Sequence, residues 1–136
     1  MPVQTITLFK GRSKEQLKII ADCVQDALVY AGYPSSDRFQ RIIELEQSNL
    51  IVDPTFPVFE ETPRTNDYLL IEIVVGTQRP DDMKHKIIER ATANLYERLK
   101  IQESDVMMMF YEVNPQTSSI HRKAESLRAQ SKEGVS

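Results

Sequence analysis

The first third of the chain changes from a strand pattern to a helix pattern and back again. Residues 3–9 are rich in β-branched and apolar side chains and alternate as strands do. After Ser13, which forms a capping-box pattern with Gln16, apolar residues recur at helical spacing until Gly32. Residues 39–45 alternate again. We therefore predict a strand, a helix and a second strand.

The second half repeats this order after a long loop. Residues 46–66 lose all periodicity and contain three prolines, so they predict a loop. A dense apolar run over residues 68–75 predicts a buried strand. Pro80 and the acids after it open a second helix with its own apolar stripe. Residues 106–112 then predict a fourth strand.

The two halves also match each other at their turns. Arg12 precedes the first helix as Arg79 precedes the second. Asp37 precedes the second strand as Asp105 precedes the fourth. Each helix-containing connection is long enough for a right-handed crossover between parallel strands. We predict an α+β fold in which tandem βαβ units form one four-stranded mixed sheet with two helices on one face.

The predicted sheet has a second face that no predicted helix covers. Residues 68–75 and 106–111 carry apolar side chains in both directions, which would leave a large exposed patch. We therefore expect the chain to form an oligomer. Residues 1–114 are assigned to a single domain. Residues 115–136 are assigned to a polar tail that is partly disordered or packs on a neighbouring subunit.

Size and charge narrow the classes of function. With 136 residues, 40% of them hydrophobic, the chain can form a core but has no room for a second full domain. A net charge of −3 lacks the basic excess of nucleic-acid-binding proteins, so we expect no nucleic-acid partner. No apolar run approaches the length of a membrane span, and no signal-peptide pattern opens the chain. We expect a cytoplasmic protein without a membrane partner.

The single cysteine and the two histidines do not suggest a metal site. Cys23, His85 and His121 are widely separated and follow no metal-ligand spacing. We therefore expect no metal and no cofactor, so that any catalysis comes from acidic, basic and cationic groups.

The predicted topology brings three polar candidates to one edge of the sheet. If a pseudo-twofold axis relates the halves, the third strand runs antiparallel to the first, and its end meets the starts of the first two strands. Pro2 opens the first strand, Asp37 precedes the second and Arg79 follows the third. These three residues are the candidates for catalysis.

Three stretches of the sequence resemble a known superfamily. Met1-Pro2 opens directly into a strand, Gly11-Arg12-Ser13 leads into a helix, and residues 34–40 read Pro-x-x-Asp-Arg-Phe-Gln. Together they are similar to the tautomerase superfamily, and within it to the malonate semialdehyde decarboxylase-like branch, over residues 2–114. The resemblance implies a tautomerase fold, a homotrimer and a cofactor-independent active site around an amino-terminal proline.

A proline at the start of the first strand also has a chemical use that does not depend on the resemblance. Removal of Met1 would expose a secondary amine whose protonation depends on burial and on neighbouring charges. In an apolar pocket this amine is a general base, and when it stays protonated it is a general acid. The resemblance further implies that Arg79 binds a substrate carboxylate and that Asp37 orients water or tunes Pro2.

Four further residues are candidates for substrate binding, each with a structural alternative. The family pattern has two arginines, two residues apart, before the second helix, and Thr77 stands at the first of these positions. Arg38 reaches either the substrate or a neighbouring subunit. Phe39 and Phe110 line an apolar pocket or serve ordinary packing.

We expect an enzyme, a tautomerase (an isomerase) of small carboxylate-bearing substrates, the 2-oxo and 2-hydroxyenoic acids, with Pro2 as general base. The first alternative is a lyase of the malonate semialdehyde decarboxylase or hydratase type, with Pro2 as general acid and water placed by Asp37. The second alternative is a non-catalytic oligomeric binding protein on the same fold, because a fold alone does not establish a function.

Overall fold

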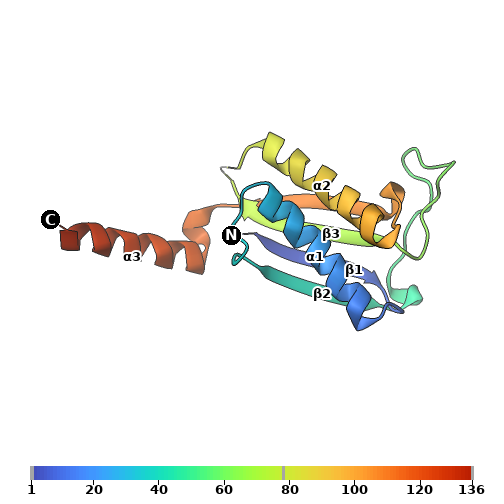
Figure 1. Cartoon of the computed structure of the whole chain (residues 1–136), viewed down its shortest axis with the longest axis horizontal. Coiled ribbons are helices and arrows are strands. Elements are labelled where there is room, and N and C mark those ends of the chain that lie inside the picture. Colours follow the sequence, from blue (N-terminus) through green and yellow to red (C-terminus); the bar gives the residue numbers. More distant parts are fainter. Residues whose placement is uncertain (1, 78, 136) are drawn as a thin grey trace.

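A computed structural model describes residues 2–77 and 79–135 of the chain. The elements in this part are β1 (Val3–Phe9), α1 (Lys14–Tyr30), β2 (Phe39–Leu45), β3 (Leu69–Gly76), α2 (Asp81–Leu99), β4 (Val106–Val113) and α3 (Ser119–Val135) (Figure 1). Short 3-10 helices span Gln47–Asn49, Glu103–Asp105 and Pro115–Thr117. The predicted strands and helices of both halves are confirmed, and β3 and β4 end one residue later than predicted.

The capping signals of α1 act as predicted. The Ser13 hydroxyl accepts a hydrogen bond from the Gln16 backbone N–H (3.1 Å), and the Gln16 side chain accepts one from the Ser13 N–H (3.3 Å). This reciprocal pair satisfies two backbone donors at the start of the helix. After the helix, Gly32 takes a φ of 118°, a conformation that glycine adopts at little cost.

The four strands form one sheet in the order β2-β1-β3-β4. β1 and β2 are parallel, β3 and β4 are parallel, and β1 and β3 are antiparallel. The predicted mixed sheet of two βαβ units is therefore confirmed. In the register of the strands, Val3 pairs with Phe39 on one side and with Val74 on the other.

Helices α1 and α2 lie side by side over one face of the sheet and enclose the core (Figure 1). Alternate residues of β1 and β3 face these helices, and Ile6, Leu8, Ile71 and Ile73 are fully buried there. They pack with buried residues of the helices, among them Ile20, Val24, Leu28, Ile87, Ala91 and Leu95. This burial is the main source of the fold's stability.

The opposite face of the sheet carries no helix in the described part of the chain (Figure 1). We call it the uncovered sheet face. Its exposed large apolar side chains are Val3, Phe39, Met107, Met109, Tyr111 and Val113. The alternation along β4 explains the set, because Met108 and Phe110 point to the other side and pack against the core. An apolar surface of this kind is typical of an interface.

The predicted loop between the halves is fastened to the end of the sheet where β3 and β4 begin. Arg64 donates hydrogen bonds to the carbonyl oxygens of Ser104 and Asp53, both at 2.9 Å. The buried Asp105 carboxylate accepts from the backbone N–H and from the hydroxyl of Thr65, both at 2.7 Å. At the same end, Arg12 and Asp67 form an ion pair at 2.9 Å.

The C-terminal tail contains a helix in the described part of the chain. Residues Ser119–Val135 form α3, which extends away from the domain (Figure 1). This segment is helical because most of its residues favour helix. They are alanine, leucine, glutamate, arginine, glutamine and lysine. Ile120 and Leu127 are exposed on α3. Packing of the tail on a neighbouring subunit stays a prediction.

No helix in residues 2–77 or 79–135 is long and apolar enough to cross a membrane.

Candidate functional site

The sheet register brings the three predicted catalytic positions to one edge. Val3 pairs with Phe39 and Val74, so the starts of β1 and β2 lie beside the end of β3. Pro2 immediately precedes β1 and is buried. Asp37 lies two residues before β2, and Arg79 lies in the turn between β3 and α2. The strand alternation puts Pro2 on the same face as Gln4, which is the face under the helices.

Arg79 lies over an aromatic ring at this edge. Its guanidinium carbon is 5.1 Å from the centroid of the Tyr33 ring, a cation–π geometry. Tyr33 is buried and follows α1, whereas Arg79 itself is exposed to solvent. The buried Tyr33 ring thus supports the exposed arginine.

The pKa of Tyr33 reports which charges surround the ring. Burial of the phenol raises this pKa above its ordinary value. Arg79 and Lys84 act in the opposite direction, and Asp37 adds to the increase. Arg79 from the turn before α2, Lys84 from α2 and Asp37 from the segment before β2 thus all act on the pKa of the same ring.

Lys84 and Glu112 form an ion pair at this edge that the sequence analysis did not single out. Glu112 of β4 pairs in register with Val75, which faces the helices and is buried. Lys84 also contacts Asp81 at 3.5 Å, and its side chain is only 12% exposed. The hydrogen bond to Glu112 is the main reason that the pKa of Lys84 is raised. The sequence carries a signal for the contact of Lys84 with Asp81, because the two residues are three positions apart on a helix.

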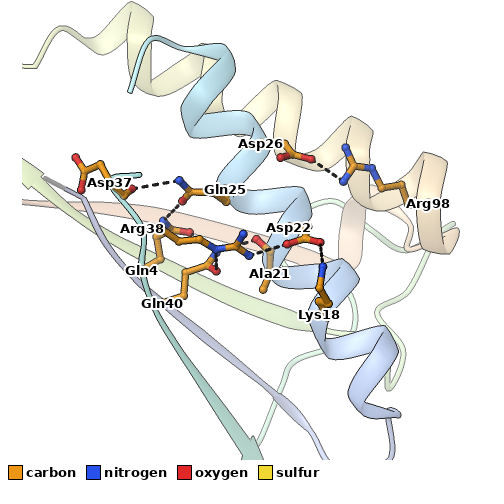
Figure 2. Close-up of polar contacts among 10 residues, drawn as sticks. All are labelled: Gln4, Lys18, Ala21, Asp22, Gln25, Asp26, Asp37, Arg38, Gln40 and Arg98. Atoms are coloured by element: carbon orange, nitrogen blue, oxygen red, sulfur yellow. Dashed lines mark hydrogen bonds and ion pairs between the residues drawn. The ribbon is translucent and has the colours of Figure 1, made fainter. Parts of the chain in front are cut away.

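Asp37 and Arg38 are held by α1 (Figure 2). The backbone carbonyl of Asp37 accepts a hydrogen bond from the Gln25 side chain (3.2 Å). The Arg38 guanidinium pairs with Asp22 of α1 at 2.7 Å. Figure 2 shows that the Asp37 carboxylate points away from this guanidinium. Arg38 is therefore directed toward Asp22 of α1 in this chain, and its contact with a substrate or a neighbouring subunit stays a prediction.

The other three candidates for substrate binding do not come together within one chain. Thr77 is exposed, and its backbone N–H donates to the Val113 carbonyl (3.1 Å). Phe39 is half exposed on the uncovered sheet face. Phe110 lies on the other face and packs against the core under the helices. The two phenyl rings therefore lie on opposite sides of the sheet.

Cys23 does not have the environment of a nucleophile. The thiol is buried in the core, and burial raises its pKa to about 11. The reactive thiolate is consequently scarce at neutral pH.

Metal-ligating side chains and two cavities along α2 bear on whether residues 2–77 and 79–135 hold a further site. Among the described residues, no group of three or more His, Cys, Asp and Glu side chains is placed to hold a metal ion. Two surface cavities of about 500 and about 260 Å³ lie along α2 and are lined by residues such as Ile88, Tyr96, Arg90 and Tyr30. Pro2, Asp37 and Arg79 do not line either of them.

Comparison with known proteins decides the family. A sequence profile for a family described as "Tautomerase enzyme" matches residues 37–121, which is more than half of the chain. The chain belongs to this tautomerase family. The resemblance stated from the sequence is thereby confirmed. Among curated proteins, no sequence matches this tautomerase-family chain.

Solved structures of the tautomerase superfamily share the fold over most of their length. FG41 malonate semialdehyde decarboxylase inhibited by 3-bromopropiolate is 29% identical, with a TM-score of 0.77, covering 86% of this chain and 87% of its own. Another malonate semialdehyde decarboxylase is 23% identical, with a TM-score of 0.78, covering 86% and 88%. Native fused 4-OT is 13% identical, with a TM-score of 0.72, covering 86% and 91%.

Proposed function

We propose that the chain is a cofactor-independent keto–enol tautomerase of small 2-oxo and 2-hydroxyenoic acids, with Pro2 as the general base. The observation that carries the proposal is the burial of Pro2 at the end of the sheet where the segments of Asp37 and Arg79 also lie. Membership in the tautomerase family supports an enzymatic role.

The proposed base is the secondary amine of Pro2 after removal of Met1. Burial disfavours the charged ammonium form of an amine, so the buried position of Pro2 supports its proposed role as a general base. In the forward reaction the amine takes a proton from carbon 3 of a 2-oxo acid, and the electron pair moves to the carbonyl oxygen as an enolate. Return of the proton to that oxygen gives the 2-hydroxyenoic acid, and ketonisation is the reverse.

Arg79 is the proposed ligand of the substrate carboxylate. A guanidinium offers paired N–H donors that match a carboxylate, and its charge stabilises the neighbouring enolate. The guanidinium lies over the face of the Tyr33 ring, which supports it. Asp37 is proposed to tune the protonation of Pro2.

The alternative from the lyase class uses the same residues in another protonation state. A protonated Pro2 would be a general acid, and Asp37 would place a water molecule for hydration or assist loss of CO₂ from a 3-oxo acid. The observation that favours it is the 29% identity to FG41 malonate semialdehyde decarboxylase. Thr77, where the family pattern has an arginine, favours the tautomerase instead.

We further propose that the chain works as a homotrimer in the cytoplasm. The apolar residues on the uncovered sheet face support assembly, because exposed patches of this kind are covered in stable proteins. Fused 4-OT proteins of the same fold are named as symmetric and asymmetric trimers. Phe39 lies on this face and would be covered in such an assembly.

The test combines an intact-mass spectrum with a phenylenolpyruvate ketonisation assay on the same sample. Loss of one methionine together with turnover is expected. Pro2→Ala should lose most of the activity, while Pro54→Ala in the distant loop is the matched control. Turnover retained in Pro2→Ala, or Met1 retained in an active sample, contradicts the proposal. A free Pro2 amine without ketonisation, but with turnover of malonate semialdehyde, supports the lyase. No turnover of either supports the binding protein.

A further inference from the structure

A chain of side-chain hydrogen bonds begins at the exposed Arg38 and returns to its neighbour Asp37 (Figure 2). Arg38 Nε donates to Gln40 Oε1 (2.7 Å), and Gln40 Nε2 donates to Gln4 Oε1 (2.7 Å). Gln4 Nε2 donates to Gln25 Oε1 (2.8 Å). Gln25 Nε2 donates to the Asp37 carbonyl oxygen (3.2 Å). We call Gln4, Gln25 and Gln40 the glutamine chain, and all its amides donate in the direction of Asp37.

Two members of the glutamine chain are buried, Gln40 is half-buried, and the chain is anchored at several points. Gln4 is 0% exposed and Gln25 is 3% exposed. Gln40 also donates to the Ala21 carbonyl of α1 (2.8 Å). Arg38 is held by the ion pair with Asp22. Breaking one link would leave buried donors or acceptors without partners, which is costly, so the links hold each other in place.

The glutamine chain also connects the segment of Asp37 to the strand start that carries Pro2. Gln4 lies two residues after Pro2 on the same face of the strand, and it pairs in register with Gln40 of β2. Gln25 reaches this pair from α1. The backbone of Asp37 is thereby fixed relative to β1.

Stability alone does not require this arrangement. The surrounding core is made of apolar side chains, and replacing a set of buried hydrogen-bonded groups by apolar groups of similar shape is often close to neutral for stability. What the amides add is a fixed direction and distance for one carbonyl, that of Asp37.

We propose that Gln25 is a positioning residue for the reaction: through its bonds to Gln4 and Asp37 it holds Asp37 in place beside Pro2. The inference rests on the proposed function of Pro2. Gln25 lies on α1 and would act only through the placement of Asp37.

The test uses two variants of Gln25 and a matched control. Gln25→Leu removes both hydrogen bonds, and Gln25→Glu still accepts from Gln4 but cannot donate to the Asp37 carbonyl. Asn94→Leu is the control, because Asn94 is also a buried amide that donates to a backbone carbonyl, that of Cys23 (3.1 Å), between the two helices. Melting temperatures are measured for all three.

For phenylenolpyruvate ketonisation, both Gln25 variants should lower kcat by on the order of 10- to 100-fold while KM changes less than about twofold, because misplacement of a catalytic group costs about this much. Asn94→Leu should lose comparable thermal stability and keep its kcat. A kcat that falls equally in Asn94→Leu overturns the inference, since general loosening would then explain the loss.

A second measurement reads Pro2 without any substrate. In ¹⁵N NMR of a proline-labelled sample, the Pro2 amine can be titrated directly. The charged groups at this edge are Asp37 before β2, Arg79 and Lys84 at α2, and Glu112 on β4. Release of the Asp37 carboxylate should lower the Pro2 pKa by about 0.5 to 1 unit in Gln25→Leu, because a nearby anion favours the protonated amine.

The two readouts separate the inference from the proposed function. If Pro2 titrates and the wild-type chain turns over substrate, but both Gln25 variants match it in kcat and in titration, the inference is overturned and the function stands. If wild-type Pro2 does not titrate as an amine or no turnover occurs, the proposed function fails and the inference fails with it. If Gln25→Leu does not fold, Gln25→Glu and Gln40→Leu provide the same test.

Discussion

The guanidinium of Arg79 and the ring of Tyr33 are stacked, with 5.1 Å between the guanidinium carbon and the ring centroid. Tyr33 is buried and its ring is fixed by the core, while Arg79 is open to solvent. A cation held against a ring face keeps the N–H groups at its rim available for other partners. Tyr33 thus gives an exposed, otherwise flexible arginine a defined place at the edge where β1 begins.

Arg79→Ala should raise KM for phenylenolpyruvate by on the order of 10- to 100-fold, the effect of losing a charge-assisted pair of hydrogen bonds. The matched control is Arg90→Ala, because Arg90 also stacks on a tyrosine, Tyr30, at 4.2 Å but lies on the outer side of α2. Its KM should stay within about twofold of wild type. Equal effects in the two variants would argue that Arg79 has no special part in binding.

The ion pairs of Asp22 make a stability prediction with a defined pH range. Its pKa lies below the ordinary value of 3.8, chiefly because of the hydrogen bond from Lys18 and then that from Arg38. A lowered pKa in the folded state means that the stabilisation is complete above the unfolded value of 3.8 and is lost as the pH falls through the folded value.

Asp22→Asn should therefore melt below wild type at about pH 7, and the two melting curves should converge at about pH 2. The control is Glu46→Gln, which removes the exposed pair with Lys10 and should change the melting temperature little at any pH. If the difference in melting temperature between Asp22→Asn and wild type is unchanged at about pH 2, the lowered pKa of Asp22 is contradicted.

Asp105→Ala should detach the loop between the halves. The Asp105 carboxylate is fully buried and holds the backbone N–H and the hydroxyl of Thr65, both at 2.7 Å. Its removal abolishes both hydrogen bonds from Thr65 to a charged group, so we expect a loss of about 2 to 3 kcal/mol in the free energy of unfolding. Urea denaturation measures this loss, and hydrogen exchange should show faster exchange confined to the loop. Asp53→Ala, in the same loop but exposed, should cost less.

The uncovered sheet face provides a prediction about assembly. Tyr111→Asp places a charge among the apolar residues of that face and should reduce the mass in light scattering from that of a trimer to that of a monomer. Tyr96→Asp is the control, because Tyr96 is an equally exposed tyrosine on α2. Far-UV circular dichroism checks that both variants stay folded. A wild-type chain that is already monomeric contradicts the proposed trimer.

Local signals explain why the bounds of β1, α1 and β2 could be predicted from the sequence. Ser13 and Gln16 define a helix start by bonds within one turn, and Gly32 marks its end by its own backbone. The order of the strands followed from the length of the connections and from the repeat of the two halves. These features depend on short stretches of chain, which a sequence displays directly.

The remaining features depend on pairs of residues that are distant in the sequence. Nothing near Tyr33 indicates that Arg79 will lie over it, and Lys84 meets Glu112 only because β4 is in register with β3. The buried state of Gln4 and Gln25 is also hidden, because isolated glutamines are usually exposed. Tertiary packing decides such contacts.

The repeat of the two halves gives two residues of the candidate site, Arg79 and Asp37, a counterpart at the opposite end of the sheet. Arg12 follows β1 as Arg79 follows β3, and Asp105 precedes β4 as Asp37 precedes β2. At that end Arg12 is neutralised by Asp67, and Asp105 is enclosed by Thr65 of the loop. The loop between the halves thus covers one of the two equivalent ends of the sheet. A trimer of these chains would offer three substrate sites, although it contains six βαβ units.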